Sequence, residues 1–180
     1  MVLAALVGCV APTACRQAAD AEQLKAVDAM TTQAEAAVLT LNELDRRRYD
    51  RADSLFRATT DLFENRFNDT LGRQSAEQLG NHYLVLRSAR AMGLDHDRVS
   101  TELAEAGRRL RALRADLAKG LMDPARGATA IATERLLLKD LDDNTHRLID
   151  NYRALQRVWE GRQALDSLLA DADPVTSYGP

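Results

Sequence analysis

The chain has 180 residues, of which 46% are hydrophobic, 4% aromatic and 28% charged, and its formal net charge is −3. This length fits one domain, and the acidic balance argues against a nucleic-acid binder, which normally carries a basic face. Alanine and leucine supply much of the apolar fraction and only four prolines occur, a composition typical of long helices or a coiled coil. The totals therefore predict an all-α protein.

The first residues form an apolar run from Val2 to Ala11, about half the length that a membrane-spanning helix needs. This is the length of the apolar region of a signal peptide. Within it, Leu6-Val7-Gly8-Cys9 resembles the lipobox of bacterial lipoproteins. The resemblance implies that the Cys9 thiol carries a diacylglycerol and that the peptide is cut before it, with Cys15 as the second candidate. It also implies a body tethered by lipid to a membrane of the bacterial cell envelope, in the periplasm or outside.

Two alternatives remain for this segment: a cleaved or degenerate signal without lipid, or a terminal turn that packs on the body with its cysteines as small hydrophobic residues. Both cysteines of the chain lie within residues 1–15. The rest therefore offers no disulfide, no cysteine-based zinc site and no thiol nucleophile. We divide the chain into a signal or lipid-attachment segment at 1–15, a helical bundle at 16–172 and a flexible tail at 173–180.

The first helical block is expected to run as one long helix of about 47–50 residues, with an apolar stripe over residues 27–67. Apolar residues follow heptad spacing until Arg48 and Arg51 occupy stripe positions that a plain coiled coil fills with leucine. Because a buried charge needs a partner, we expect either a locally open interface or ion pairs with acids such as Asp140, Asp142 or Asp143. Residues 68–70 match a glycosylation sequon and are expected to end this helix and cap the next.

The second and third blocks are expected at residues 71–92 and 95–119. Gly93 is predicted to be a left-handed C-cap and Asp95 an N-cap, with Gly120 ending the third block. The third block has the most regular stripe, in which six apolar positions recur at alternating steps of four and three: Val99, Leu103, Ala106, Leu110, Leu113 and Leu117. Such a narrow stripe is typical of a helix that faces a partner helix.

The fourth block is predicted to begin at Asp123-Pro124, an N-cap followed by proline at the first helical position. It is expected to continue to residue 172, about 47 residues or roughly 70 Å at 1.5 Å per residue. Its stripe comprises Leu138, Leu141, Thr145, Leu148, Tyr152, Leu155 and Trp159.

The lengths of the blocks allow two layouts, because the second and third together match each of the outer two. The middle pair either stack end to end or form a hairpin at residues 93–95, and the near-continuity of their stripes favours stacking. Either way, we predict an elongated antiparallel bundle of three to four helices with coiled-coil-like packing. Tyr49, Ala52 and Phe56 resemble the second half of a tetratricopeptide repeat, and Leu79-Gly80 with Tyr83 the first half of another, but at a spacing six residues too long.

Two arginine clusters are candidate contact sites for a polyanion, anionic lipid headgroups or an acidic partner. Arginines on a solvated helix face are the alternative interpretation. One cluster comprises Arg46, Arg47, Arg48 and Arg51, and the other Arg108, Arg109, Arg111 and Arg114.

The densest group of metal-ligand residue types is Asp95-His96-Asp97. Consecutive residues point in different directions, so a helix start accounts for these acids better than a metal site does. We expect His82 to be hydrogen-bonded at the edge of the bundle and His146 to form an exposed pair with Asp150. No metal site and no cofactor are predicted.

The sequence thus favours a non-catalytic lipoprotein, a scaffold or adaptor that binds another envelope protein or the cell wall through a long helical surface. A periplasmic carrier of a small ligand or metal, built on a helical bundle, is the main alternative. A tetratricopeptide-like interaction module is the other.

Overall fold

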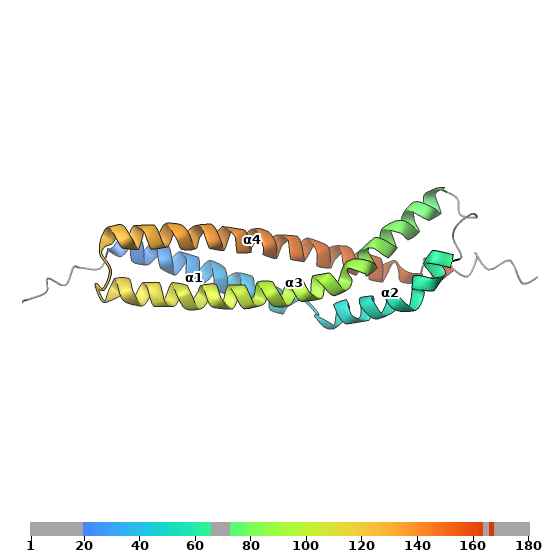
Figure 1. The fold of residues 1–180 in the computed structure, drawn as a ribbon, viewed down its shortest axis with the longest axis horizontal. Helices are drawn as coiled ribbons and strands as arrows, with labels where there is room; N and C mark the ends of the chain where they lie inside the picture. Colours follow the sequence, from blue (N-terminus) through green and yellow to red (C-terminus); the bar gives the residue numbers. More distant parts are fainter. Residues whose placement is uncertain (1–19, 66–72, 164–165, 168–180) are drawn as a thin grey trace, which may run out of the picture.

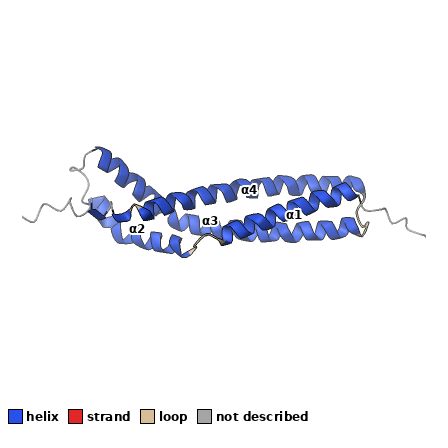
Figure 2. Ribbon diagram, turned by 180° about the vertical axis from the view of Figure 1, so that it is seen from behind, coloured by secondary structure: helices blue, strands red, loops and turns tan. Residues whose placement is uncertain are grey.

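The described residues form an elongated rod of four α-helices. The computed structural model describes residues 20–65, 73–163 and 166–167. The helices are α1 (Ala21–Asn42), α2 (Arg47–Asn65), α3 (Arg73–Ala118) and α4 (Pro124–Glu160). In Figure 1, α1 and α2 lie one after the other along α3, α4 runs beside them, and the first part of α3 bends away from α2. No strand occurs among the described residues, as Figure 2 shows. The predicted all-α elongated bundle is confirmed.

The half of the rod that contains α1 is a three-helix bundle of α1, α3 and α4. The predicted stripe of α3 is confirmed, because all six of its apolar residues are buried. Burying a leucine side chain stabilises the fold by about 1.5–3 kcal/mol. The core at this end comprises Val27, Met30, Ala34, Leu110, Leu113, Leu117, Ile131 and Leu138. Ala106, Leu141 and Leu148 belong to the next layer along the rod.

The first predicted helix is in fact two helices, and the prediction of one helix over residues 27–67 is wrong. The chain turns at residues 43–46, where Asp45 begins the second helix. Its carboxylate accepts the backbone N–H of Arg47 at 3.1 Å, and its carbonyl accepts that of Arg48 at 2.9 Å. An aspartate in this position satisfies N–H groups that have no partner inside the helix. The turn resets the helical phase, and Tyr49 and Ala52 are buried in α2.

Residues 73–118 form one uninterrupted helix, so the predicted boundary at Gly93 and Asp95 is wrong. The stacked layout is confirmed in its continuous form, and the hairpin is excluded. Gly93 has a second role inside the helix, because a Cβ built there would lie 3.4 Å from the Cβ of Tyr49. The glycine thus lets α2 approach α3 closely, and no left-handed conformation is involved.

The predicted turn between the last two helices is confirmed. Gly120 adopts a left-handed φ of 63° after α3 ends at Ala118, as a C-cap glycine does. The Asp123 carboxylate accepts the backbone N–H of Arg126 at 3.0 Å. At its other end α4 ends at Glu160, with Gly161 as its C-cap. Residues 162–163 and 166–167 are again helical, and the predicted end at residue 172 lies outside the described residues.

Several predictions concern residues outside the described ranges. The lipobox-like segment with Cys9 and Cys15, the sequon at 68–70 and the tail at 173–180 are among them. Of the helices that the structure describes, none combines the length and the apolar character that crossing a membrane requires.

Candidate functional site

The first arginine cluster lies at the turn between α1 and α2, and three of its four side chains use their charge in contacts within the chain. Arg46 forms an ion pair with Asp97 of α3. Arg51 pairs with Asp45 at 2.6 Å, while the guanidinium carbon of Arg48 lies 5.3 Å from the centre of the Tyr152 ring. The predicted pairing of Arg48 and Arg51 with acids at positions 140–143 is therefore wrong. The turn at 43–46, which moves both arginines off the α1 stripe, is the physical reason.

The fourth member of this cluster, Arg47, contributes backbone groups to the same turn. Its N–H bonds to Asp45, and its carbonyl accepts Nε of Arg51 at 3.3 Å. The cluster as a whole holds the start of α2.

The side chains of the second arginine cluster point in different directions from the surface of α3. Two of them form hydrogen-bonded ion pairs with other helices. Arg109 Nε lies 2.8 Å from Glu134 of α4. Arg114 Nε lies 2.5 Å from Asp28 of α1. These carboxylates raise the pKa of both guanidinium groups through hydrogen bonds to the charged form. Arg109 and Arg114 therefore connect helices of the bundle.

The other two members, Arg108 and Arg111, line an open groove between α1 and α3. Their nearest carboxylates are distant, with Arg108 3.7 Å from Glu105 and Arg111 3.6 Å from Glu35. Both distances exceed normal hydrogen-bond length. Within one cluster, the arginines away from the groove are tightly paired and those at the groove are loosely held.

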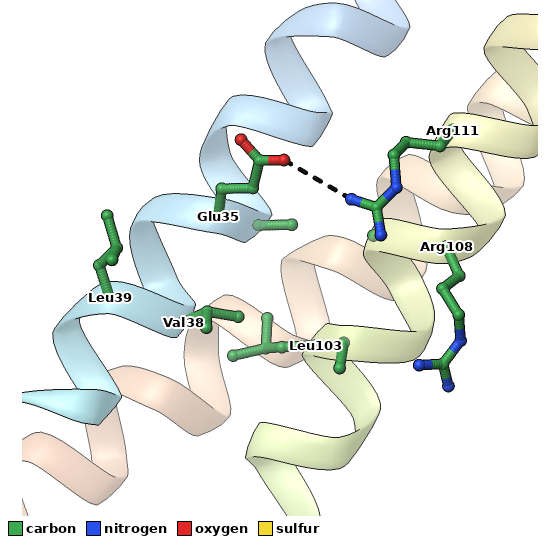
Figure 3. Close-up of a pocket in the computed structure, with 9 residues that line it drawn as sticks. Glu35, Val38, Leu39, Leu103, Arg108 and Arg111 are labelled. Carbon is green, nitrogen blue, oxygen red and sulfur yellow. Dashed lines mark ion pairs between the residues drawn. The ribbon is translucent and has the colours of Figure 1, made fainter.

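The groove has a volume of about 470 Å³ and a mostly apolar lining. In Figure 3, Leu39 on α1 and Arg108 on α3 stand at its opposite lips, Glu35 and Arg111 point toward each other across it, and α4 lies behind. Leu39 is 65% exposed. The lining residues are Ala34, Glu35, Val38, Leu39, Leu103, Ala104, Gly107, Arg108 and Arg111. Apolar lining with a charged rim is the character of a helix-binding groove.

Gly107, on the floor of this groove, has no packing reason to be glycine. It lies inside α3 with no positive φ, where glycine costs about 1 kcal/mol relative to alanine. The three atoms nearest to a Cβ built there all belong to the guanidinium of Arg111, the closest at 3.4 Å. The space above Gly107 is thus covered by the end of one flexible side chain.

A buried polar cluster joins the α1–α2 turn to the other two helices. The hydroxyl of Tyr49 lies 3.4 Å from Nδ1 of His96, and the rings of Tyr49 and Tyr152 meet edge to face at 5.7 Å. Burial raises the pKa of Tyr49. Burial also lowers the pKa of His96, with Arg46 acting in the same direction and Asp97 opposing it. Both side chains are therefore neutral in the folded protein near pH 7. We call the cluster of Tyr49, His96 and Tyr152 the joint, because it connects α2, α3 and α4.

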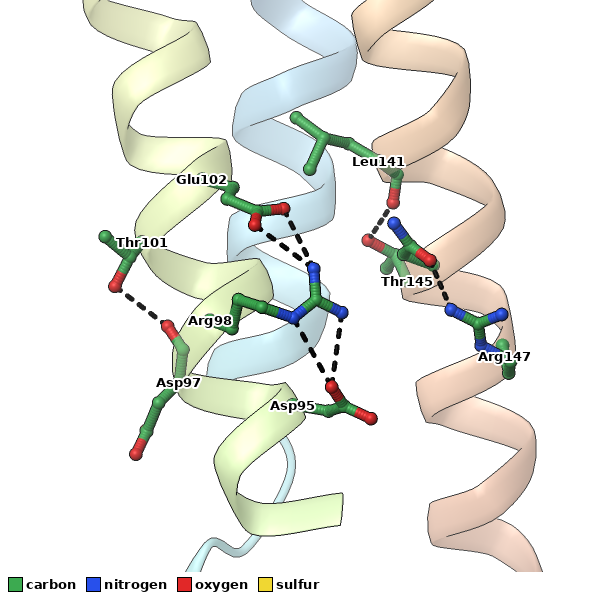
Figure 4. Close-up of polar contacts among 9 residues, drawn as sticks. Asp95, Asp97, Arg98, Thr101, Glu102, Leu141, Thr145 and Arg147 are labelled. Atoms are coloured by element: carbon green, nitrogen blue, oxygen red, sulfur yellow. Dashed lines mark hydrogen bonds and ion pairs between the residues drawn. The ribbon is translucent and has the colours of Figure 1, made fainter. Parts of the chain in front are cut away.

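The triplet Asp95-His96-Asp97 does not converge on one point. Figure 4 shows Arg98 between Asp95 and Glu102, with its Nη2 3.2 Å from the first and its Nη1 3.1 Å from the second. His96 is buried against Tyr49. Arg46 holds Asp97. The aspartates were predicted to begin a helix, but this prediction is wrong, because they lie in the middle of α3. There each of them forms an ion pair with an arginine.

The remaining histidines give a mixed result. His146 is exposed as predicted, although Nδ1 bonds the carbonyl of Asp142 at 2.9 Å and does not pair with Asp150. His82 was predicted to be hydrogen-bonded, yet its Nε2 is buried without a partner in the described structure. No group of three or more possible metal ligands gathers among the residues whose positions are described.

Sequence reasoning missed the groove and the role of Asp45. The groove is formed by residues about 70 positions apart, so no local pattern indicates it. Asp45 did carry a signal, because it directly precedes the arginines that interrupt the heptad stripe. Comparison with protein-family models, with curated proteins and with solved structures finds no match.

Proposed function

We propose that this chain is a non-catalytic scaffold or adaptor of the bacterial envelope that acts by contact along its helical surface. The observation that carries the proposal is a rod whose surface charges are largely paired within the chain while several large leucines stay exposed. Four of these leucines, Leu39, Leu84, Leu94 and Leu136, are 60–67% exposed. Exposed leucines among paired charges, with Leu39 at the rim of the apolar α1–α3 groove, support protein contact better than anion binding.

The lipid tether is the second part of the proposal. The resemblance of Leu6-Val7-Gly8-Cys9 to a lipobox supports it, as does the restriction of cysteine to the first 15 residues. The described body begins at Asp20, eleven positions after Cys9 (20 − 9 = 11). Lipid attached at Cys9 would place the membrane near the end of the rod where α1 starts. Several acyl chains anchor a protein firmly, since each buried methylene contributes about 0.8 kcal/mol.

Replacing each cysteine in turn tests the tether. We expect mass spectrometry of the chain from bacterial membranes to find the mass of a diacylglycerol on Cys9 and to lose it in Cys9→Ser. Cys15→Ser is the matched control and should keep both the lipid and the membrane fraction. A lipid that persists in Cys9→Ser and disappears in Cys15→Ser would move the site, and a lipid-free native chain would refute the tether.

Site-directed photo-crosslinking tests the contact function. A photoreactive residue at Leu94 should yield defined adducts with an envelope protein or with cell-wall material. The same residue at Arg153, whose side chain is 66% exposed and pairs with Asp150 of its own helix, is the control. Equal, diffuse labelling from both positions would contradict a specific surface.

The carrier and tetratricopeptide-like alternatives have weaker support. A carrier needs an enclosed cavity with converging polar groups, whereas the α1–α3 groove is open and mostly apolar. A tetratricopeptide array needs pairs of short helices, whereas Leu79, Gly80 and Tyr83 lie inside the 46-residue helix α3.

A further inference from the structure

The lining of the groove between α1 and α3 indicates what kind of segment could bind there. Its apolar lining suits a leucine, and the loosely held Arg108 and Arg111 suit a carboxylate. A helix carrying leucine and aspartate one turn apart on its outer face would satisfy both. Leucine and aspartate at i and i+4 lie on the same face of a helix.

The outer face of α4 in this same chain has that character. Leu136 is 67% exposed, although Leu138 and Leu141 on the same helix are buried. Asp140, four residues after Leu136, is exposed and has no ion pair in the described part of the chain. The neighbouring acid Asp143 is taken by Lys139 at 2.8 Å. This leucine and aspartate on α4, called here the α4 ridge, match the chemistry of the groove.

The α4 ridge and the groove lie on opposite faces of the rod. In the three-helix half, α4 packs against both α1 and α3, and Figure 3 shows it behind the groove. A ridge cannot reach the groove of its own chain, but it can reach that of a second copy. Ridge and groove are different surfaces, so the contact would be heterologous and able to repeat.

The two surfaces also lie at the same height along the rod. Arg109, which is adjacent to Arg108 of the groove, pairs with Glu134 of α4 at 2.8 Å. Leu137 and Asp140 line a second small depression together with Glu105 and Arg109. Copies placed side by side in parallel would therefore bring the ridge of one level with the groove of the next.

We propose that the chain self-associates side by side, with Leu136 and Asp140 of one copy in the α1–α3 groove of the next, where Asp140 meets Arg108 and Arg111. The occupant is thus a second copy of this chain. The parallel arrangement keeps equivalent ends together, which is compatible with a common tether. The inference concerns the folded body alone and stands or falls independently of lipid attachment.

The experiment uses the full 180-residue chain carrying Cys9→Ser and Cys15→Ser, so that lipid and disulfides play no part. Sedimentation velocity over a wide concentration range measures association. Leu39→Glu breaks the groove and Leu136→Glu breaks the ridge, while Leu94→Glu adds the same charge at an equally exposed position away from both. Circular dichroism checks that each variant retains its helices.

We expect the parent chain and Leu94→Glu to form species larger than dimers as concentration rises. Each of the other two variants should shift association to at least tenfold higher concentration. Mixing Leu39→Glu with Leu136→Glu is the diagnostic step, because one retains an intact ridge and the other an intact groove. The mixture should form dimers and nothing larger. Likewise Arg108→Glu should weaken association, and a chain carrying both Arg108→Glu and Asp140→Arg should recover it.

A parent chain that stays monomeric at the highest concentrations would overturn the proposal and leave the groove for a different protein. The proposal would also be overturned if neither the mixture nor the charge swap restored association. Loss of association on Leu39→Glu but not on Leu136→Glu would overturn it as well, since that result points to a symmetric contact of groove with groove.

Discussion

The backbone N–H of Asp45 donates a hydrogen bond to the hydroxyl oxygen of Tyr152 across 3.1 Å, and this contact joins the α1–α2 turn to α4. Removing the hydroxyl in Tyr152→Phe leaves the ring contacts with Tyr49 and Arg48 in place but removes the acceptor. Losing one hydrogen bond of this kind costs about 0.5–1.5 kcal/mol. Urea unfolding followed by circular dichroism should show the lower stability, and an unchanged midpoint would mean that this joint contributes nothing.

The joint should also make stability depend on pH. Burial lowers the pKa of His96 in the folded protein, so the fold binds a proton less readily than the unfolded chain does. The stabilisation that neutral His96 gives the fold is therefore complete above about pH 6.5, the ordinary pKa of histidine. This stabilisation is lost progressively as the pH falls below that value. His96→Gln should flatten the stability profile between about pH 7 and pH 5.

His146→Gln is the matched control for this prediction, because His146 lies exposed on α4. Its profile should follow that of the native chain. Equal slopes for the native chain and for His96→Gln would contradict a neutral, buried His96 in the joint.

Two glycines should respond oppositely to alanine. At Gly107 the atoms nearest to an added methyl group belong to the flexible end of Arg111, so Gly107→Ala should stabilise the fold by about 0.5–1 kcal/mol through helix propensity. At Gly127 a Cβ would lie 2.8 Å from Leu117 Cδ2 and 2.5 Å from Gln23 Oε1, so Gly127→Ala should destabilise it. Thermal unfolding of the two variants measures both changes in stability. A Gly107→Ala variant that melts at a lower temperature than the native chain would show that the added methyl group is not accommodated.

The α3 stripe should contain the main stabilising contacts of the rod. Leu110 is fully buried among α1, α3 and α4, so Leu110→Ala should cost about 2–5 kcal/mol through lost burial and a cavity. Leu94→Ala, on the exposed side of the same helix, should change stability by no more than about 0.5 kcal/mol. Similar losses at both positions would mean that α3 packs through a different face.

The sequence predicts most of the packing, because heptad spacing is a local property of each helix. The stripes of α3 and α4 are buried as predicted, apart from the half-exposed Trp159, and the turn at Gly120 and Asp123 is where its caps indicate. Local signals failed where tertiary contacts outweigh them. Gly93 and Asp95 have the residue types of a helix boundary, but α3 is continuous there, where Tyr49 packs against Gly93 and Arg46 pairs with Asp97.

The candidate site was predicted only in part. Both arginine clusters are recognisable in the sequence. The sequence does not show which arginines of the second cluster pair with another helix and which line the groove. Whether an arginine bonds to Glu134 or lies loosely at a groove depends on which helix is its neighbour. That neighbour is set by the packing of α1 and α4 on different sides of this stretch of α3, which joins residues far apart in the sequence.

Every surface described above depends on α3 being one helix, so the distance along it is the most direct test. Spin labels at Leu84→Cys and Ala112→Cys, in a chain carrying Cys9→Ser and Cys15→Ser and diluted with unlabelled chain, lie 28 residues apart. At 1.5 Å per residue, pulsed electron-spin resonance should find one distance of about 42 Å. A distance below about 20 Å, as a hairpin at Gly93 would give, would contradict the continuous rod and with it the α4 ridge and the groove.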